Sequence, residues 1–507
     1  MSWDRTRRWF GTDLGALVLI AGARCLLHLL TNGRYGFHRD ELLTFHNARH
    51  LAWGYVVYPP LTPFLARVEL ALFGASLAGF RIFAALSQGL VMLLTGLSAR
   101  ELGGHRVAQV VAALAVATSG HALVSGWFMS YSTFDYLWWT VAAYTVIRLL
   151  KSDDPRWWLA IGCAVALGLL TKYTMAFLVL GIAGGLFLTG ARRFLRSPWL
   201  WAGVALSLLI VSPNLLWQAQ HGFVALDFLQ SIHARDVHRG WTDYFLPNQL
   251  WKCANPVTIP LWMAGLWFLF AAPAGKRFRM LGWMYLIPLL ALFLAHGRDY
   301  YLAAAYPMLF AAGAVCGESW LLSLNPKSAS AVRHTLWWSF ASAFLLTASV
   351  TLPLAPRHSG WWHFADSVNG GNFNSQLGWR QMTETVARVR DSLPPADLHS
   401  LGILSTDDGQ TGAVSLYGPA YHLPPAISGM NSNWYRGPGD APPQAVITLG
   451  FDRQFLQANF ESCLLAAHMT DPEILQNDSI NWNTEIYVCR KLRTPWPEFW
   501  QQLKSYG

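Results

Sequence analysis

Two adjacent carboxylates, Asp40 and Glu41, are the residues whose types and spacing best fit chemistry in this chain. They follow directly on the first long apolar segment, and a carboxylate at the edge of a membrane is costly unless it has a use. One carboxylate of such a pair can take a proton from an acceptor hydroxyl while its neighbour orients the first. Acidic residues also occur commonly at helix starts, so a solvated pair that caps a helix is an equal alternative on the local sequence.

A helix on the membrane surface would present this pair. From Asp40 onward, apolar residues alternate with arginines and histidines, which predicts a helix lying along the membrane. Gly54 and Pro59-Pro60 would end it. This first outer loop, residues 32–79, is therefore expected to hold the carboxylates at the mouth of a membrane domain.

The composition indicates a polytopic membrane protein. Of 507 residues, 53% are hydrophobic and only 13% are charged, with 26 tryptophans, far from an average soluble domain. The net charge of +9 could suggest nucleic acid, but the basic residues cluster in short turns between apolar runs, which is typical of topology signals. We therefore expect a bilayer and no nucleic acid as partner. The basic segment Met1–Phe10 resembles a signal peptide, but the long apolar run after it lacks a cleavage site and predicts an uncleaved span.

Apolar segments of roughly bilayer-spanning length predict about eleven transmembrane helices. If the N-terminus is cytoplasmic, every inward turn is basic, as the positive-inside rule requires. The loop 32–79 and everything after Pro353 then face outward. The predicted spans are residues 12–31, 80–99, 107–125, 134–150, 157–171, 173–189, 198–216, 256–272, 280–296, 301–320 and 334–353.

The predicted fold class is mainly α, with a transmembrane domain at 1–353 and a second, extracytoplasmic domain at 354–507. The second domain is polar and predicts a mixed α/β fold with an amphipathic helix near 378–392. Its strand-like runs are residues 401–405, 411–417, 445–449 and 484–490.

Two cysteines of the second domain, Cys463 and Cys489, could pair in an oxidising compartment. No spacing rule fixes their connectivity, so a disulfide and two unpaired buried thiols remain equal alternatives.

Cationic and phenolic side chains recur at the outer ends of the predicted spans, where they suit the phosphate of a lipid. Each could instead snorkel to the headgroups or belong to an aromatic belt, and Asp135 could be an N-cap. Function is favoured for Lys172 and Arg298, which lie in very short outward turns. The predicted substrate-binding residues are Lys172, Tyr173, Arg298, Tyr300, Tyr58 and Asp135.

The sequence does not decide whether the protein binds a metal ion. Seven histidines placed outside would allow a divalent metal with Asp40 or Glu41, but no fixed ligand spacing such as His-Glu-x-x-His is present. A Walker loop and a dinucleotide glycine pattern are also missing from the sequence, so cytoplasmic ATP or NAD chemistry is unsupported.

Six short motifs between residues 10 and 320 together resemble the bacterial polytopic glycosyltransferases of the family-39-like group. These enzymes are related to protein O-mannosyltransferases and to the lipid A aminoarabinose and galacturonic acid transferases. A tail segment at 416–429 is similar to the tail of the same group. The motifs are Asp40-Glu41, Tyr-Pro-Pro-Leu at 58–61, Ala-Arg-Glu-Leu-Gly-Gly at 99–104, Phe-Asp-Tyr-Leu-Trp-Trp at 134–139, Leu-Leu-Thr-Lys-Tyr at 169–173 and Tyr-Tyr-Leu-Ala-Ala-Ala-Tyr-Pro at 300–307.

The resemblance implies a GT-C type fold and transfer of a hexosyl or pentosyl unit from a polyprenyl-phosphate-linked donor, on the outer face of the cytoplasmic (inner) membrane. It also implies that Asp40 is the catalytic base of an inverting reaction. In the mechanism that we expect from the residues themselves, Glu41 orients while Lys172 and Arg298 stabilise the departing phosphate. Relatives often have Lys or His directly before Pro-Pro-Leu, where this chain has Tyr58. That difference puts donor contact at this position in doubt. The acceptor, a hydroxyl of an envelope lipid, glycan or protein, is encoded in no motif.

Two other functions compete with this interpretation. A transporter or flippase of lipid-linked sugars should carry its ionisable groups in the middle of its spans, whereas here they lie at outer ends. An envelope polysaccharide polymerase or ligase usually places its functional charges in a late, large outer loop, whereas this chain opens with its carboxylates.

Overall fold

The computed structural model describes residues 12–439 and 441–507, so the basic segment Met1–Phe10 lies outside the described residues. The chain folds into two compact units. Unit 1 consists of the described residues of Met1–Asn32 together with Arg81–Gly222 and His233–Leu354. Unit 2 consists of Gly33–Phe80, Phe223–Ile232 and Ala355–Gly507, so the first outer loop groups with the C-terminal tail.

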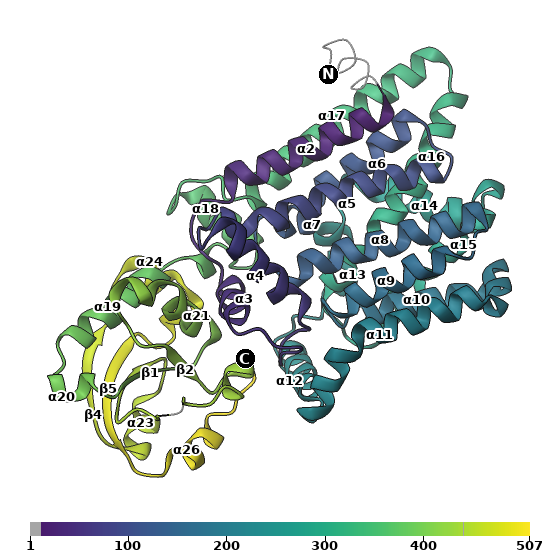
Figure 1. Cartoon of the computed structure of the whole chain (residues 1–507). Coiled ribbons are helices and arrows are strands. Elements are labelled where there is room, and N and C mark those ends of the chain that lie inside the picture. The colour runs from purple at the N-terminus through teal and green to yellow at the C-terminus, as the bar shows by residue number, and fades with distance from the viewer. Residues whose placement is uncertain (1–11, 440) are drawn as a thin grey trace. The chain divides into compact units, whose positions relative to one another are not determined.

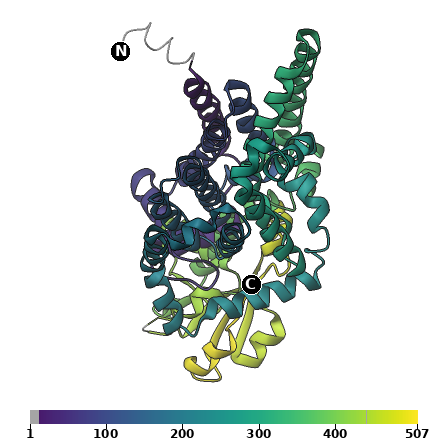
Figure 2. The same cartoon turned by 90° about the vertical axis from the view of Figure 1, so that its right-hand side faces the viewer.

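Unit 1 is built from long apolar helices that run side by side in Figure 1 and are seen nearly end-on in Figure 2. Helix α12 (Val224–His238) is shared, since its first residues belong to unit 2. The helices of unit 1 are α2 (Asp13–Thr31), α5 (Ile82–Glu101), α6 (Arg106–Thr118), α7 (Gly120–Ser125), α8 (Tyr131–Ser152), α9 (Trp157–Leu169), α10 (Met175–Leu188), α11 (Pro198–Gln220), α13 (Phe245–Asn248), α14 (Ile259–Phe270), α15 (Arg279–Leu294), α16 (Tyr306–Ser323) and α17 (Pro326–Thr351).

Every one of the predicted apolar segments coincides with a helix or helix pair of unit 1. Among the described residues, five helices are long and apolar enough to cross a membrane, or up to seven if each bent helix pair counts as one span. The mainly helical membrane fold is therefore confirmed, while the count of about eleven crossings and their orientation stay predictions.

Close helix packing in unit 1 depends on small residues. A Cβ atom on Gly313 of α16 would lie 1.8 Å from the carbonyl oxygen of Leu261, and one on Gly265 of α14 would lie 2.3 Å from that of Leu309. Helices in lipid gain little from the hydrophobic effect, so they associate through such close backbone contact. Any side chain at either glycine would push α14 and α16 apart.

Unit 2 contains a mixed five-stranded sheet in the order β2-β1-β3-β5-β4 (Figure 1). Strand β1 (Leu401–Ser405) pairs in parallel with β2 (Ala426–Ser428) and β3 (Ala445–Leu449). Strand β5 (Glu485–Leu492) runs antiparallel to β3 and to β4 (Phe460–His468). The helices of this unit are α3 (Arg39–Arg49), α4 (Leu61–Phe73), α18 (Gly360–Val368), α19 (Trp379–Asp391), α20 (Pro395–Leu398), α21 (Asp408–Tyr417), α22 (Asn431–Trp434), α23 (Arg453–Asn459), α24 (Pro472–Gln476), α25 (Asp478–Asn481) and α26 (Trp496–Gln502).

The predicted strand at 411–417 is wrong, because these residues lie in helix α21. The Asp407 side chain accepts a hydrogen bond from the Gly409 amide at 2.6 Å and so caps this helix. The surface helix of the first loop also ends earlier than predicted, at Arg49. The strands predicted at 401–405, 445–449 and 484–490 and the helix near 378–392 are confirmed as β1, β3, β5 and α19.

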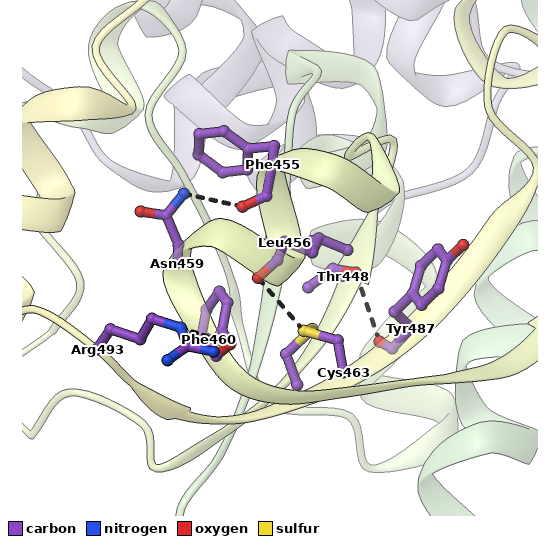
Figure 3. The surroundings of a disulfide bond; sticks show 9 residues. Thr448, Phe455, Leu456, Asn459, Phe460, Cys463, Tyr487 and Arg493 are labelled. Atoms are coloured by element: carbon purple, nitrogen blue, oxygen red, sulfur yellow. Dashed lines mark hydrogen bonds between the residues drawn. A yellow bond between two sulfur atoms is a disulfide. The ribbon is translucent and has the colours of Figure 1, made fainter.

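A disulfide joins Cys463 to Cys489, which decides between the two alternatives that the sequence leaves open. The two residues are direct partners in the antiparallel pairing of β4 with β5, with their Cα atoms 4.1 Å apart. Figure 3 shows the start of β4 beside the disulfide, where the Arg493 Nε donates to the Phe460 carbonyl oxygen at 3.1 Å. The bond ties the outer strand of the sheet to its neighbour.

Candidate active site

The N-terminus of α3 gives Asp40 and Glu41 different tasks. The His38 ring Nδ1 accepts from the Asp40 amide at 3.1 Å, and the Glu41 Oε2 accepts from the His38 amide at 2.9 Å. This reciprocal arrangement is a capping box, and Glu41 is fully buried within it. Glu41 therefore fixes the helix start on which Asp40 sits.

The Asp40 carboxylate, in contrast, is accessible. Its side chain is 39% exposed and its ion pair with Arg39 is long, at 3.8 Å. Within the described part of the chain it accepts no hydrogen bond from a protein donor. An accessible carboxylate without a fixed donor can accept a proton from a bound hydroxyl.

Helix α3 is held against α21 of the same unit. A Cβ atom on Gly412 would lie 2.4 Å from the carbonyl oxygen of Leu42, so a glycine is needed where the two helices meet. At the start of α3, Arg39 approaches the Asp407 carboxylate at 3.7 Å. The carboxylate that the sequence singles out is thus positioned by the α/β fold of unit 2.

Tyr58 is buried beneath α3. Its hydroxyl accepts a hydrogen bond from the Asn47 amide nitrogen at 2.7 Å, and the Asn47 Oδ1 accepts from Arg436 at 2.5 Å. Only 2% of Tyr58 is exposed. In this structure Tyr58 supports α3, and its role in donor binding stays a prediction.

Asp408 lies in the same network and is 3% exposed. Its two carboxylate oxygens accept from the side-chain amides of Asn431 at 2.6 Å and Asn433 at 2.8 Å. Burial raises the pKa of Asp408 to about 7, although the Asn431 hydrogen bond and the positive charges of Arg39 and Arg436 oppose that rise.

We expect unit 2 to lose stability as the pH rises from about 4 to about 7, between the ordinary pKa of a carboxyl group and the pKa of Asp408 in the folded protein. A group whose pKa is higher in the folded than in the unfolded state contributes fully to the free energy of unfolding below its ordinary pKa. For Asp408 this contribution falls by up to ~1.4 kcal/mol per pH unit and is lost by the time the pH passes about 7. Burial lowers the pKa of His46 well below its ordinary value, so this neighbour stays neutral over the same range.

Hydrogen exchange of peptides spanning 401–434, corrected for intrinsic rates, measures this dependence. In Asp408→Asn the pH dependence should disappear. The free energy of unfolding should also fall by about 1–3 kcal/mol, because the new amide nitrogen would face the donor groups of Asn431 and Asn433. An unchanged slope in the variant would refute the assignment.

In unit 1, Lys172 lies between α9 and α10 as a buried cation. Its ammonium nitrogen lies over three tyrosine rings, at 5.2 Å from Tyr131, 4.7 Å from Tyr300 and 4.4 Å from Tyr301, measured to the ring centroids. It also donates to the Ser132 hydroxyl at 3.2 Å. Within the described residues it forms no salt bridge, although its charge acts on the nearby Asp135.

Asp135 of α8 belongs to this cluster. Its Oδ2 accepts from the Thr174 hydroxyl at 2.9 Å, while its buried Oδ1 has no hydrogen-bond partner in the described structure. The N-cap of α8 is Ser130, not Asp135. Asp135 is therefore not the helix cap that the sequence offers as an alternative.

Arg298 is paired more completely than the sequence suggests. Its guanidinium makes two hydrogen bonds to Asp236, at 2.5 and 2.7 Å, and lies 4.5 Å from the centroid of Trp241. Burial would raise the pKa of Asp236, but the hydrogen bonds and charge of Arg298 and Arg235 hold it below its ordinary value. Asp236 was not predicted, and its sequence signal was only an Arg-Asp pair in a long outer loop.

The structure brings together Lys172, Asp135 and Tyr300 of the predicted binding residues, and Arg298 acts electrostatically on Lys172. Tyr173 points elsewhere, because its hydroxyl accepts from the Gln218 amide nitrogen at 3.1 Å on α11. Tyr131 and Tyr301 complete the cage around Lys172. In the sequence, Tyr301 lies in the same short outer turn as Arg298, whereas Tyr131 lies in the turn 126–133, which holds no charged residue to draw attention to it.

Unit 1 also holds an apolar cavity of about 510 Å³. It is lined mainly by aliphatic and aromatic side chains, and Gln249 is a polar exception. The Gln249 amide nitrogen donates to the Asp299 carbonyl oxygen at 2.9 Å, in the turn that carries Arg298 and Tyr300. A hydrocarbon chain would fit the cavity. Among the described residues, no group of three or more His, Cys, Asp or Glu side chains is placed to hold a metal ion.

Comparison with known proteins shows what the chain is similar to. The family described as dolichyl-phosphate-mannose-protein mannosyltransferase matches residues 57–217. The lipid A galacturonosyltransferase RgtD of Rhizobium johnstonii is 25% identical over 219 residues, which cover 43% of this chain and 46% of that protein. The match thus spans less than half of the curated relative.

Solved structures of ArnT from Cupriavidus metallidurans share the fold over most of the chain. The apo structure has a TM-score of 0.59 and the structure bound to undecaprenyl phosphate 0.57, each with 16% identity over 94% of this chain and 98% of that one. These matches confirm the resemblance that the motifs predict: the chain is similar to bacterial polytopic GT-C glycosyltransferases and shares the fold of the ArnT structures.

Proposed function

We propose that this protein is a glycosyltransferase of the inner membrane. It moves a sugar from a polyprenyl-phosphate-linked donor to a hydroxyl of an envelope lipid, glycan or protein on the outer face. In this proposal the N-terminus is cytoplasmic and the C-terminal domain is periplasmic.

The observation that carries the proposal is the state of Lys172. A buried ammonium without a salt bridge needs an anion to offset the loss of its hydration. The tyrosine rings hold the Lys172 ammonium group in place. The apolar cavity beside the turn that carries Arg298 and Tyr300 suits an isoprenoid chain. A lipid phosphate supplies both the anion and the chain, and one of the ArnT structures contains undecaprenyl phosphate.

The reaction needs one base and a stabilised leaving group. Asp40 accepts the proton of the acceptor hydroxyl while the oxygen of that hydroxyl forms a bond to the anomeric carbon of the donor sugar. The bond from that carbon to the phosphate oxygen breaks on the opposite face, so the configuration inverts and the lipid phosphate leaves as an anion. Lys172 stabilises that charge, with a weaker part for Arg298, whose own charge is largely neutralised by Asp236.

Purified protein in nanodiscs tests the proposal. Undecaprenyl phosphate carrying a labelled hexose or pentose is supplied with envelope lipids, glycans or proteins, and the products are analysed by mass spectrometry. The same analysis on cells with and without the protein identifies the acceptor. Transport of the intact donor without any transfer would instead support a flippase.

A further inference from the structure

A second cavity, of about 320 Å³, lies within unit 2 at the carboxyl ends of the three parallel strands. Thr406 follows β1, Gly429 follows β2 and Gly450 follows β3, and all three line it. In the order β2-β1-β3 the chain passes from β1 to β2 on one side, and then from β2 to β3 on the other side of β1. The carboxyl ends of β1 and β3 therefore form a topological switch point, the place where open α/β sheets hold ligands.

Aromatic side chains form part of the wall of this cavity. Trp482 is 56% exposed, and Phe455 stacks on Phe451 with ring centroids 5.5 Å apart. Gly450 allows the Trp482 ring to lie against the backbone, since a Cβ atom there would be 2.9 Å from the ring carbon Cζ2. The φ of Gly450, +76°, also lies in the left-handed region that favours glycine.

Polar groups of the cavity are available to a ligand. The Asp452 carboxylate and the Gln502 amide, both exposed, make no hydrogen bond or salt bridge within the described residues. Gln410 is fully buried, and both atoms of its amide lack a partner in the described structure. Its nitrogen lies 3.1 Å from the position of a Cβ atom on Gly450, directly behind the cavity wall.

We infer that this cavity binds an uncharged saccharide. An exposed indole offers an apolar surface to the C–H face of a sugar ring, while the carboxylate and amide can bond its hydroxyls. Lys, Arg and His are missing from the lining residues, and Asp452 would repel an anion, so a phosphate or nucleotide is disfavoured. None of the residues to which we assign sugar transfer lines this cavity, so the inference goes beyond the proposed function.

The full-length protein in nanodiscs tests the inference by saturation-transfer NMR and calorimetry. The probes are the methyl glycosides of glucose, galactose, mannose and N-acetylglucosamine, with inorganic phosphate in a separate arm. We expect at least one glycoside to bind, and Trp482→Ala to weaken it by about tenfold, as loss of an aromatic anchor does. Asp452→Asn should weaken it less.

Trp361→Ala is the matched control, because Trp361 is an exposed tryptophan of the same unit, 47% exposed, outside the cavity. It should leave binding unchanged, as should Lys172→Ala, which separates this cavity from donor binding. The inference is overturned if no glycoside binds, if phosphate binds instead, or if the Trp482 and Asp452 variants, shown by hydrogen exchange to be folded, bind as well as the wild type.

Discussion

Asp40→Asn is expected to lower the rate of sugar transfer by about 10²- to 10⁴-fold, the contribution of a positioned general base. Asparagine keeps the shape of the side chain but cannot take the acceptor proton. The fold should survive, because the Asp40 carboxylate accepts no protein hydrogen bond in the described structure and the cap of α3 is made by His38 and Glu41. Loss of a solvated carboxylate at a helix start costs only about 1 kcal/mol.

Glu41→Gln is the matched control beside it. Glutamine can still accept the His38 amide hydrogen bond that closes the capping box, so the variant should fold and transfer sugar at a moderately reduced rate. Steady-state transfer with purified protein and labelled donor measures both variants. If Asp40→Asn transfers at a near wild-type rate, the base is elsewhere.

The sequence predicted the helices of unit 1 well because apolar length is a strong signal. Each predicted segment falls on a helix or a helix pair, and the basic turns between segments mark where helices end. It did not predict how first-loop residues join the tail, since such a grouping depends on long-range contacts. Local periodicity also failed at 411–417, where a cap at Asp407 and the contact of Gly412 with α3 favour a helix.

The candidate site was predictable in composition but not in pairing. Charged and phenolic groups at outer turns pointed to Lys172, Tyr300 and Asp135, which the structure brings together. The partner of Arg298 was not foreseeable, because Asp236 lies 62 residues earlier in the chain. Similarly, the pair Asp40-Glu41 looks uniform in sequence, and only the capping box distinguishes a buried structural carboxylate from an accessible one.

The second large effect is expected at Lys172. Lys172→Ala should lower transfer by about 10²- to 10³-fold, as removal of a preorganised group that stabilises a developing anion does, and it should also weaken binding of undecaprenyl phosphate. Lys172→Arg should retain part of the binding, because it keeps the charge but not the shape of the tyrosine cage. Lys327→Ala, an exposed lysine at the start of α17, is the matched control and should behave as wild type.

The neighbouring ion pair separates a phosphate-binding role from a general electrostatic one. Arg298→Ala should reduce transfer less than Lys172→Ala, since the charge of Arg298 is already balanced by Asp236. Asp236→Asn frees that guanidinium, so it should strengthen binding of undecaprenyl phosphate in the wild type and partly restore it in Lys172→Ala. If Lys172→Ala binds and uses the donor as the wild type does, Lys172 serves only to anchor the turn, and the proposed leaving-group site is wrong.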